Sequence, residues 1–145
     1  MKTILVAYDD TEPSRRALDR AASLAEAFGS RVLVTSIAPL VHSSPRSVTQ
    51  IDRGGGVGTH TDEVRRAQAV LEERGIAAES VTAVGDPASS IAQLAEDRGA
   101  DLVVIGTRGL GPVQRLLGQS VSQAVSRRVN CDLLIVHPGP GGKED

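Results

Sequence analysis

The residues best suited to bind a ligand are glycines in a short run that follows an apolar segment. The run reads GTRGLGPVQRLLGQS and includes Gly106, Gly109 and Gly118. Glycine lets a backbone approach a ligand closely, and backbone N–H groups that point together bind phosphate. Ser120 ends this run and Ser122 follows it, and their hydroxyls and the free amides of a helix start would add donors. The pattern predicts an anion site, although a purely structural tight turn also favours glycine.

Two adjacent carboxylates, Asp9 and Asp10, follow the first apolar segment of the chain. Such a pair resembles the acidic pair with which phosphorylation receiver domains hold Mg²⁺. That interpretation needs a lysine after the last strand, but the lysines are Lys2 and Lys143, and the last apolar segment ends at His137. The pattern therefore disfavours a receiver domain and leaves the two carboxylates as a turn that closes the strand.

Other reactive residues do not form a recognisable site. The glycines within 54–58 have no strand before them and no Lys-Ser/Thr after them, which excludes a Walker loop. His42, His60 and His137 are too scattered to indicate a metal site, and Cys131 has no activating neighbour. No catalytic triad or carboxylate dyad stands out, so we predict no catalytic residue and no protein-held metal.

The composition fits one globular domain and argues against several classes of partner. The chain has 145 residues, of which 40% are hydrophobic and 23% are charged. A net charge of −2 and only two aromatic residues, Tyr8 and Phe28, argue against nucleic-acid binding. The start MKTILVAYDD becomes acidic too early for a signal peptide, no apolar run approaches the roughly 18 residues of a membrane span, and the lone Cys131 forms no internal disulfide. We expect a cytoplasmic protein that binds neither membranes nor nucleic acid.

Strand-like and helical patterns alternate along the chain. Short apolar segments without strict alternation predict buried strands at 4–8, 31–37, 78–84, 101–105 and 133–136. Capping and stop signals bound the first three helices, at Thr11 and Gly29, Thr61 and Gly75, and Asp86 and Gly99. Apolar spacing places Phe28 on the buried face of the first helix, and a fourth helix is predicted at 120–128.

This alternation demands parallel strands joined by right-handed crossovers. The predicted fold is a Rossmann-like α/β three-layer sandwich over residues 1–137, with a five-stranded parallel sheet flanked by four helices. Residues 38–60 are expected to form a long flexible loop and residues 138–145 a disordered tail. Ligands of such sheets bind beyond the carboxyl ends of the strands, where Asp9, Ile37, Gly85 and Gly106 are expected.

Four segments, in order, resemble the universal stress protein family over residues 1–137. They are ILVAYDDTEPS, GDPASSI, ADLVVIGTRGLG and SVSQAVSRRVNCDLLIV. The resemblance implies an adenine nucleotide alpha hydrolase-like fold, an adenine nucleotide at the carboxyl edge of the sheet, and a homodimer formed through the last strand. The site residues that it implies are Ala7, Asp9, Ile37, Gly106, Arg108, Gly109, Gly118, Gln119, Ser120, Val121 and Ser122.

The chain departs from the family's phosphate-binding motif at one position. Nucleotide-binding members carry GxxG, nine further residues, and then glycine followed by Ser or Thr. Gly106 and Gly109 fit the first part, but Gln119 occupies the later glycine position, with Gly118 one residue early and Ser120 at the hydroxyl position. A Cβ in a left-handed turn costs roughly 1–2 kcal/mol and obstructs a close phosphate. Either the turn shifts to Gly118, or the site accepts a smaller nucleotide or none.

The resemblance implies one leading function and two alternatives. The leading hypothesis is a stress-response protein that signals by binding an adenine nucleotide, ATP first among them, with Mg²⁺ as an optional ion. In it, Asp9 would meet the ribose, Ile37 the adenine and Arg108 the phosphate charge. No clear general base is present, so at most slow ATP hydrolysis is expected. The alternatives are a cyclic AMP-binding member and a dimeric interaction module that binds no nucleotide, which Gln119 favours.

Overall fold

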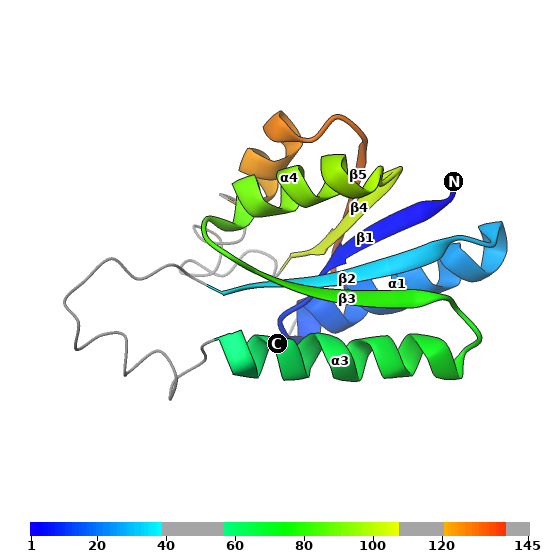
Figure 1. Cartoon of the computed structure of the whole chain (residues 1–145). Coiled ribbons are helices and arrows are strands. Elements are labelled where there is room, and N and C mark those ends of the chain that lie inside the picture. The colour runs from blue at the N-terminus through cyan, green and yellow to red at the C-terminus, as the bar shows by residue number, and fades with distance from the viewer. Residues whose placement is uncertain (39–56, 108–120, 139–145) are drawn as a thin grey trace.

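The computed structural model describes residues 1–38, 57–107 and 121–138, and these form a parallel sheet with helices on both faces (Figure 1). The strand order is β3-β2-β1-β4-β5, and each neighbouring pair is parallel. The predicted fold class is therefore confirmed, and every predicted strand lies within one residue of its observed bounds. These bounds are β1 (Thr3–Ala7), β2 (Arg31–Ala38), β3 (Ala78–Val84), β4 (Leu102–Gly106) and β5 (Asp132–Val136).

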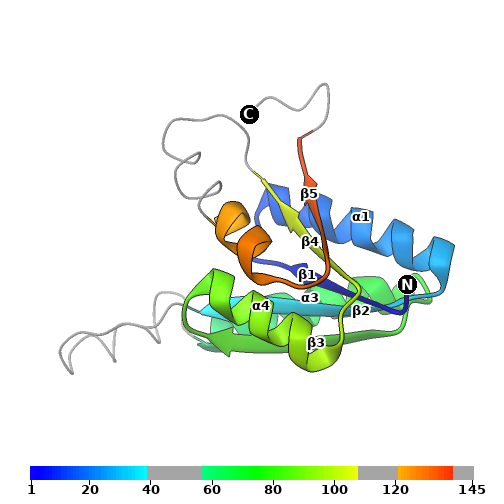
Figure 2. The same cartoon turned by 90° about the horizontal axis from the view of Figure 1, so that it is seen from above.

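Helices cover both faces of the sheet, as Figures 1 and 2 show. Helices α1 (Glu12–Phe28) and α3 (Val57–Glu73) cover one face, and α4 (Pro87–Arg98) covers the other together with a helix at residues 121–128. None of the helices in the described part of the chain combines the length and hydropathy needed to cross a membrane.

The alternation of side chains along the strands produces two separate apolar cores. Ile4, Val6 and Val34 pack with α1 and α3, and on the opposite face Leu5 and Leu33 pack with α4 and the 121–128 helix. Because both faces are covered, the central strands are apolar at nearly every position, as a parallel sheet requires. The carboxyl ends of β1 and β4, where the strand order reverses, meet at one edge.

Local capping signals explain why two of the helices begin and end where they do. Thr11 caps α1, and Gly29 ends it with a left-handed φ of 69°. Asp86 caps α4 by accepting a hydrogen bond from the Ser89 N–H, and Gly99 ends that helix with a φ of 64°. These predicted boundaries are confirmed because each depends on residues adjacent in the sequence.

The predicted start of the second helix is wrong. Helix α3 begins at Val57, four residues before the predicted cap, so residues 57–60 are helical rather than part of the expected 38–60 loop. Thr61 does not act as the cap, since its Oγ1 lies 3.0 Å from Thr82 Oγ1 on β3. His60, in the added first turn, contacts Ser36 on β2. These contacts between distant segments override the weak helix propensity of Gly58.

The buried face of α1 is shorter than predicted. Phe28 is 59% exposed, although its spacing places it with the buried residues Ala21 and Ala25. Phe28 is the last residue of α1, next to the left-handed Gly29 that ends the helix, and it is not part of the apolar core that Ala21 and Ala25 join.

Candidate functional site

The turn between β1 and α1 is held by hydrogen bonds among three side chains. Thr11 Oγ1 accepts from the Ser14 N–H at 3.5 Å, and Ser14 Oγ accepts from the Thr11 N–H at 3.1 Å, which forms a capping box. Ser14 Oγ also accepts from the Asp9 N–H at 3.2 Å. Asp9 Oδ1 accepts from the Thr11 N–H at 3.2 Å and from Thr11 Oγ1 at 2.5 Å. The Asp9 carboxylate therefore has a defined position at the start of α1.

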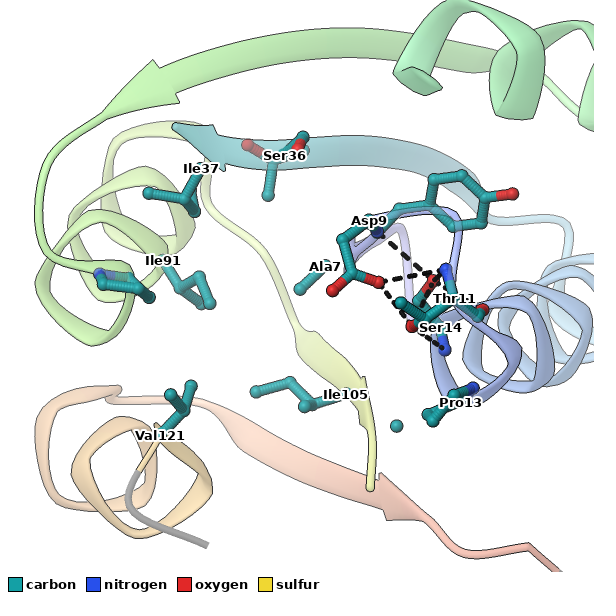
Figure 3. Close-up of a pocket in the computed structure, with 14 residues that line it drawn as sticks. Ala7, Asp9, Thr11, Pro13, Ser14, Ser36, Ile37, Ile91, Ile105 and Val121 are labelled. Atoms are coloured by element: carbon teal, nitrogen blue, oxygen red, sulfur yellow. Dashed lines mark hydrogen bonds between the residues drawn. The ribbon is translucent and has the colours of Figure 1, made fainter. Parts of the chain in front are cut away.

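The Asp9 carboxylate has one oxygen available to a ligand. Oδ1 carries both hydrogen bonds from Thr11, whereas Oδ2 has no hydrogen-bond partner among the described residues. Figure 3 shows the carboxylate turned toward the pocket that Ala7 and Ile105 also line. An ionised carboxylate only accepts hydrogen bonds, so it suits a ligand that presents hydroxyl or amino donors.

A pocket of about 270 Å³ opens beside Asp9 at the carboxyl edge of the sheet. Its aliphatic wall consists of four side chains from separate elements, namely Ile37, Ile91, Ile105 and Val121. Figure 3 shows these four side chains grouped on one side, with Asp9, Thr11 and Ser14 on the other. The pocket therefore suits a ligand with one flat apolar part and one hydroxyl-bearing part.

Gly106 has a packing role that the sequence did not reveal. An added Cβ would lie 2.0 Å from the Pro13 carbonyl oxygen and 2.5 Å from the Pro13 carbonyl carbon. Both groups belong to backbone, which cannot move aside as a flexible side chain can. Glycine at the end of β4 thus lets the first turn of α1 lie directly against the sheet, and the pocket is lined by both Pro13 and Gly106.

The structure brings together five of the predicted site residues, from β1, the turn after it, β2, β4 and the 121–128 helix. These five, all lining the pocket, are Ala7, Asp9, Ile37, Gly106 and Val121. Ser122 is 7% exposed and does not line it, so a ligand contact from its hydroxyl stays a prediction. The other predicted residues lie outside the described residues: Arg108, Gly109, Gly118, Gln119 and Ser120.

Sequence reasoning missed several pocket residues. Ile91 belongs to the helix predicted after Asp86 and not to the predicted site, yet it is both buried and part of the pocket wall. Ile105 was likewise treated as an ordinary strand residue. The available signal was position, because Ile91 lies in the first turns of a helix that begins at the ligand-binding edge. Thr11 is recognisable from the sequence as a cap, but its contact with Asp9 and that of Ser14 are not.

Asp10 lies next to Asp9 and interacts with different neighbours. The hydrogen bond from Tyr8 lowers the pKa of the Asp10 carboxyl, and the charges of Arg15 and Arg66 act in the same direction. Burial raises the pKa of the Tyr8 phenol, and the Asp10 hydrogen bond and charge raise it further. The pair therefore stays in the state in which Tyr8 is the donor and Asp10 the ionised acceptor.

A second polar cluster lies between β2 and the first turns of α3. His60 Nδ1 lies 2.5 Å from Ser36 Oγ and 3.5 Å from Glu63 Oε1. Burial raises the pKa of the Glu63 carboxyl, as do the nearby charges of Asp10 and Asp9, while His60 opposes the shift. Within the described residues, no group of three His, Cys, Asp or Glu side chains is placed to hold a metal ion.

Comparison with known proteins gives the family. Residues 1–137 match the Universal stress protein family model. The chain belongs to the universal stress protein family. It is 34% identical over 142 residues to universal stress protein Rv1636 of Mycobacterium tuberculosis, covering 94% of this chain and 96% of that one. It is 31% identical over 146 residues to universal stress protein YxiE of Bacillus subtilis, covering 92% and 97%.

Solved structures of universal stress proteins share the fold, and several contain adenine nucleotides. One in complex with cAMP is 29% identical, with a TM-score of 0.73 and coverage of 94% of this chain and 97% of that one. One from Archaeoglobus fulgidus in complex with dAMP is 21% identical, with a TM-score of 0.67 and coverage of 94% and 98%. One from Arabidopsis thaliana with AMP bound is 17% identical, with a TM-score of 0.69 and coverage of 94% and 92%. At these lower identities, the last two establish only a shared fold with this universal stress protein.

Proposed function

We propose that this chain binds an adenine nucleotide in the pocket beside Asp9 and acts in the stress response through that binding. The observation that carries the proposal is the combination, in one pocket, of an acceptor carboxylate and an aliphatic wall. The pocket also lies where parallel sheets bind ligands, at the carboxyl ends of strands flanking the reversal of strand order. The relative at 29% identity that was solved with cAMP supports the same ligand class.

Each part of the nucleotide has a suitable counterpart in the pocket. The aliphatic side chains of Ile37 and Ile91 suit the faces of an adenine ring, whose burial is favourable. Oδ2 of Asp9 suits the ribose hydroxyls, since a carboxylate accepts from two donors. The phosphates would extend toward Val121, and the donors proposed for them belong to Arg108, Gly109, Gly118, Gln119, Ser120 and Ser122.

ATP, with Mg²⁺ on its phosphates, is the first ligand that we propose, and cyclic AMP is the second. Cyclic AMP is favoured by the solved relative that contains it. The two differ at the ribose, because ATP, ADP and AMP offer two free ribose hydroxyls to Asp9 and the 3′,5′-cyclic nucleotide offers one. The relative affinity of the protein for AMP and for cyclic AMP therefore indicates whether Asp9 accepts hydrogen bonds from two ribose hydroxyls or from one. The proposal concerns binding, with at most slow hydrolysis of ATP.

Thermal unfolding of ligand-free protein tests the proposal directly. The protein is titrated with ATP, ADP, AMP and cAMP, each with and without Mg²⁺, with GTP as the base-specificity control. A ligand at one hundred times its Kd adds about 2.7 kcal/mol, which raises the Tm of a chain of this size by roughly 5–11 °C. A shift of that size with one adenine nucleotide supports the proposal. No shift with any of them overturns it and favours the interaction module that binds no nucleotide.

We further propose that the chain forms a homodimer through β5. This strand is an edge of the sheet and pairs with β4 alone within the described residues. Its side chains Leu133, Leu134 and Ile135 are only partly buried. An unpaired apolar edge strand is a ready surface for a second copy. Light scattering after size-exclusion chromatography should give a dimer at micromolar concentration, and a monomer mass would contradict this proposal.

A further inference from the structure

Asp10 has a backbone conformation that its residue type disfavours. Its φ is 63°, and among the described residues it is the one non-glycine residue with a positive φ. This left-handed region is energetically unfavourable for a residue with a Cβ, although aspartate tolerates it better than most residues. Such a conformation persists only where surrounding contacts maintain it, and it is a reason to look for a function.

Contacts from three elements maintain the conformation of Asp10. Tyr8, the residue after β1, donates its O–H to Asp10 Oδ1 at 3.0 Å. One guanidinium N–H of Arg15, on α1, donates to the Asp10 carbonyl oxygen at 2.6 Å, and the same nitrogen lies 3.3 Å from Oδ1. Arg66 of α3 lies 3.5 Å from Oδ2. The side chain of Asp10 is thus held on both carboxylate oxygens, and its backbone is held as well.

The left-handed residue is also the middle of the turn that orients Asp9. The Thr11 N–H reaches back across Asp10 to Asp9 Oδ1, and Thr11 Oγ1 donates to the same oxygen. The dihedral angles of Asp10 decide whether Thr11 can meet Asp9 in this way. If Asp10 left the left-handed region, the Thr11 donors would move and the Asp9 carboxylate would lose its present orientation toward the pocket.

We propose that Asp10 is a positioning residue, which holds the turn that aims the Asp9 carboxylate at the hydroxyls of a bound ligand. This inference rests on the proposed nucleotide binding and assigns to it a residue that does not itself line the pocket. It gives Arg15 and Arg66 an indirect part in ligand selection, since both bind Asp10. It also makes a specific claim, namely that Asp10 determines how strongly the protein distinguishes ribose from 2′-deoxyribose.

The test measures the Kd of AMP and of 2′-deoxy-AMP by calorimetry for the wild type, Asp10→Gly, Asp9→Asn and the double variant. Glycine adopts a positive φ at no cost, so Asp10→Gly should fold, yet it lacks the carboxylate that Tyr8, Arg15 and Arg66 hold. We expect Asp10→Gly to weaken AMP binding about fivefold to tenfold, equivalent to about 1–1.4 kcal/mol. The ratio of the Kd of 2′-deoxy-AMP to the Kd of AMP should fall in Asp10→Gly toward the value for Asp9→Asn. The double variant should show no further fall in this ratio.

Two further variants separate positioning from a general loss of structure. Asp10→Asn keeps an acceptor for Tyr8 and tolerates a left-handed φ, so it should retain part of the discrimination. Asp62→Asn removes an exposed α3 carboxylate that has no hydrogen bond or ion pair among the described residues, and it should match the wild type. An unchanged Kd ratio in Asp10→Gly, with or without equal weakening of both ligands, would overturn the positioning role. Failure of the wild type to bind AMP, ATP or cAMP would instead overturn the proposed function and this inference with it.

Discussion

Gly106 at the end of β4 lies so close to Pro13 at the start of α1 that a Cβ on Gly106 would be 2.0 Å from the Pro13 carbonyl oxygen. This contact joins two segments about ninety residues apart and forms one corner of the pocket. The first glycine of the GxxG pattern is therefore required for packing, whatever the later glycines do for phosphate. Its substitution should affect folding before it affects binding.

Gly106→Ala should destabilise the protein by about 3 kcal/mol, the upper end of the range for overpacking, because the contact is with backbone. For a chain of this size, this lowers the Tm by roughly 6–12 °C. Gly58→Ala is the matched control, since a Cβ at Gly58 meets nothing within 4 Å and lies in α3, where alanine is the better helix former. Differential scanning calorimetry of both variants and the wild type measures these changes in Tm. A Gly106→Ala variant as stable as the wild type would show that the first turn of α1 can move away.

Asp9→Asn should weaken adenine nucleotide binding about tenfold while leaving the Tm of the ligand-free protein nearly unchanged. The amide oxygen can still accept from Thr11, but the charged acceptor offered to the ligand is lost, and hydrogen bonds to charged groups contribute about 1.5–3 kcal/mol. Calorimetric titration measures the Kd of Asp9→Asn and of the control Asp62→Asn, which removes the same negative charge elsewhere. Equal affinities in the two variants would remove Asp9 from the site.

Glu63→Gln should stabilise the protein at pH 8 and not at pH 4. Burial raises the pKa of Glu63 in the folded state above its ordinary value, so the folded protein holds this proton to higher pH than the unfolded chain does. The contribution of Glu63 to the stability of the folded protein is therefore fully present below the pKa of the unfolded chain, and it is lost as the pH rises through the pKa of the folded state. Glutamine does not ionise, so the variant does not lose this stability at high pH. We expect its Tm at pH 8 to be about 2 °C higher, which corresponds to roughly 0.5–1 kcal/mol in the free energy of unfolding. Melting curves from pH 4 to pH 8 for both proteins test this, and a gain that is largest at pH 4 would reverse the assigned sign.

Cys131 should react slowly with iodoacetamide at pH 7.5. Burial raises the pKa of its thiol, and the negative charges of Asp132 and Asp101 raise it further, so little thiolate is present. The rate in the folded protein should be at least about threefold below that of the same chain in urea, since reaction requires the thiolate. Asp132→Asn should increase the folded rate, and mass spectrometry of the alkylated peptide follows both. Equal rates in folded and unfolded protein would contradict the raised pKa of the Cys131 thiol.

Most of the fold was predictable because its signals are local. Apolar segments gave the five strands to within one residue, and the caps at Thr11 and Asp86 gave the helix starts of α1 and α4. Alternation of strands and helices then required a parallel sheet. We expected a ligand site at the carboxyl edge, and the structure has a pocket there that Asp9, Ile37 and Gly106 line.

What failed depended on contacts between distant segments. The first turn of α3 exists where His60 meets Ser36, which no local pattern around residues 57–60 predicts. Phe28 has the spacing of a buried residue but is exposed at the last position of α1, outside the apolar core. Ile91 of α4 joined the pocket wall because the fold places α4 beside the end of β2.

By itself, the sequence determined the order and type of the elements and most of their ends, since hydrophobic periodicity and helix caps act over a few residues. Only the tertiary structure decided which side chains share a pocket and which glycine is needed for packing. The turn at Asp10 shows the reason: its hydrogen bonds with Tyr8 and Arg15 are local, but its ion pair with Arg66 joins it to α3, a distant segment of the chain. Free energy of that kind comes from segments that meet only in the folded chain.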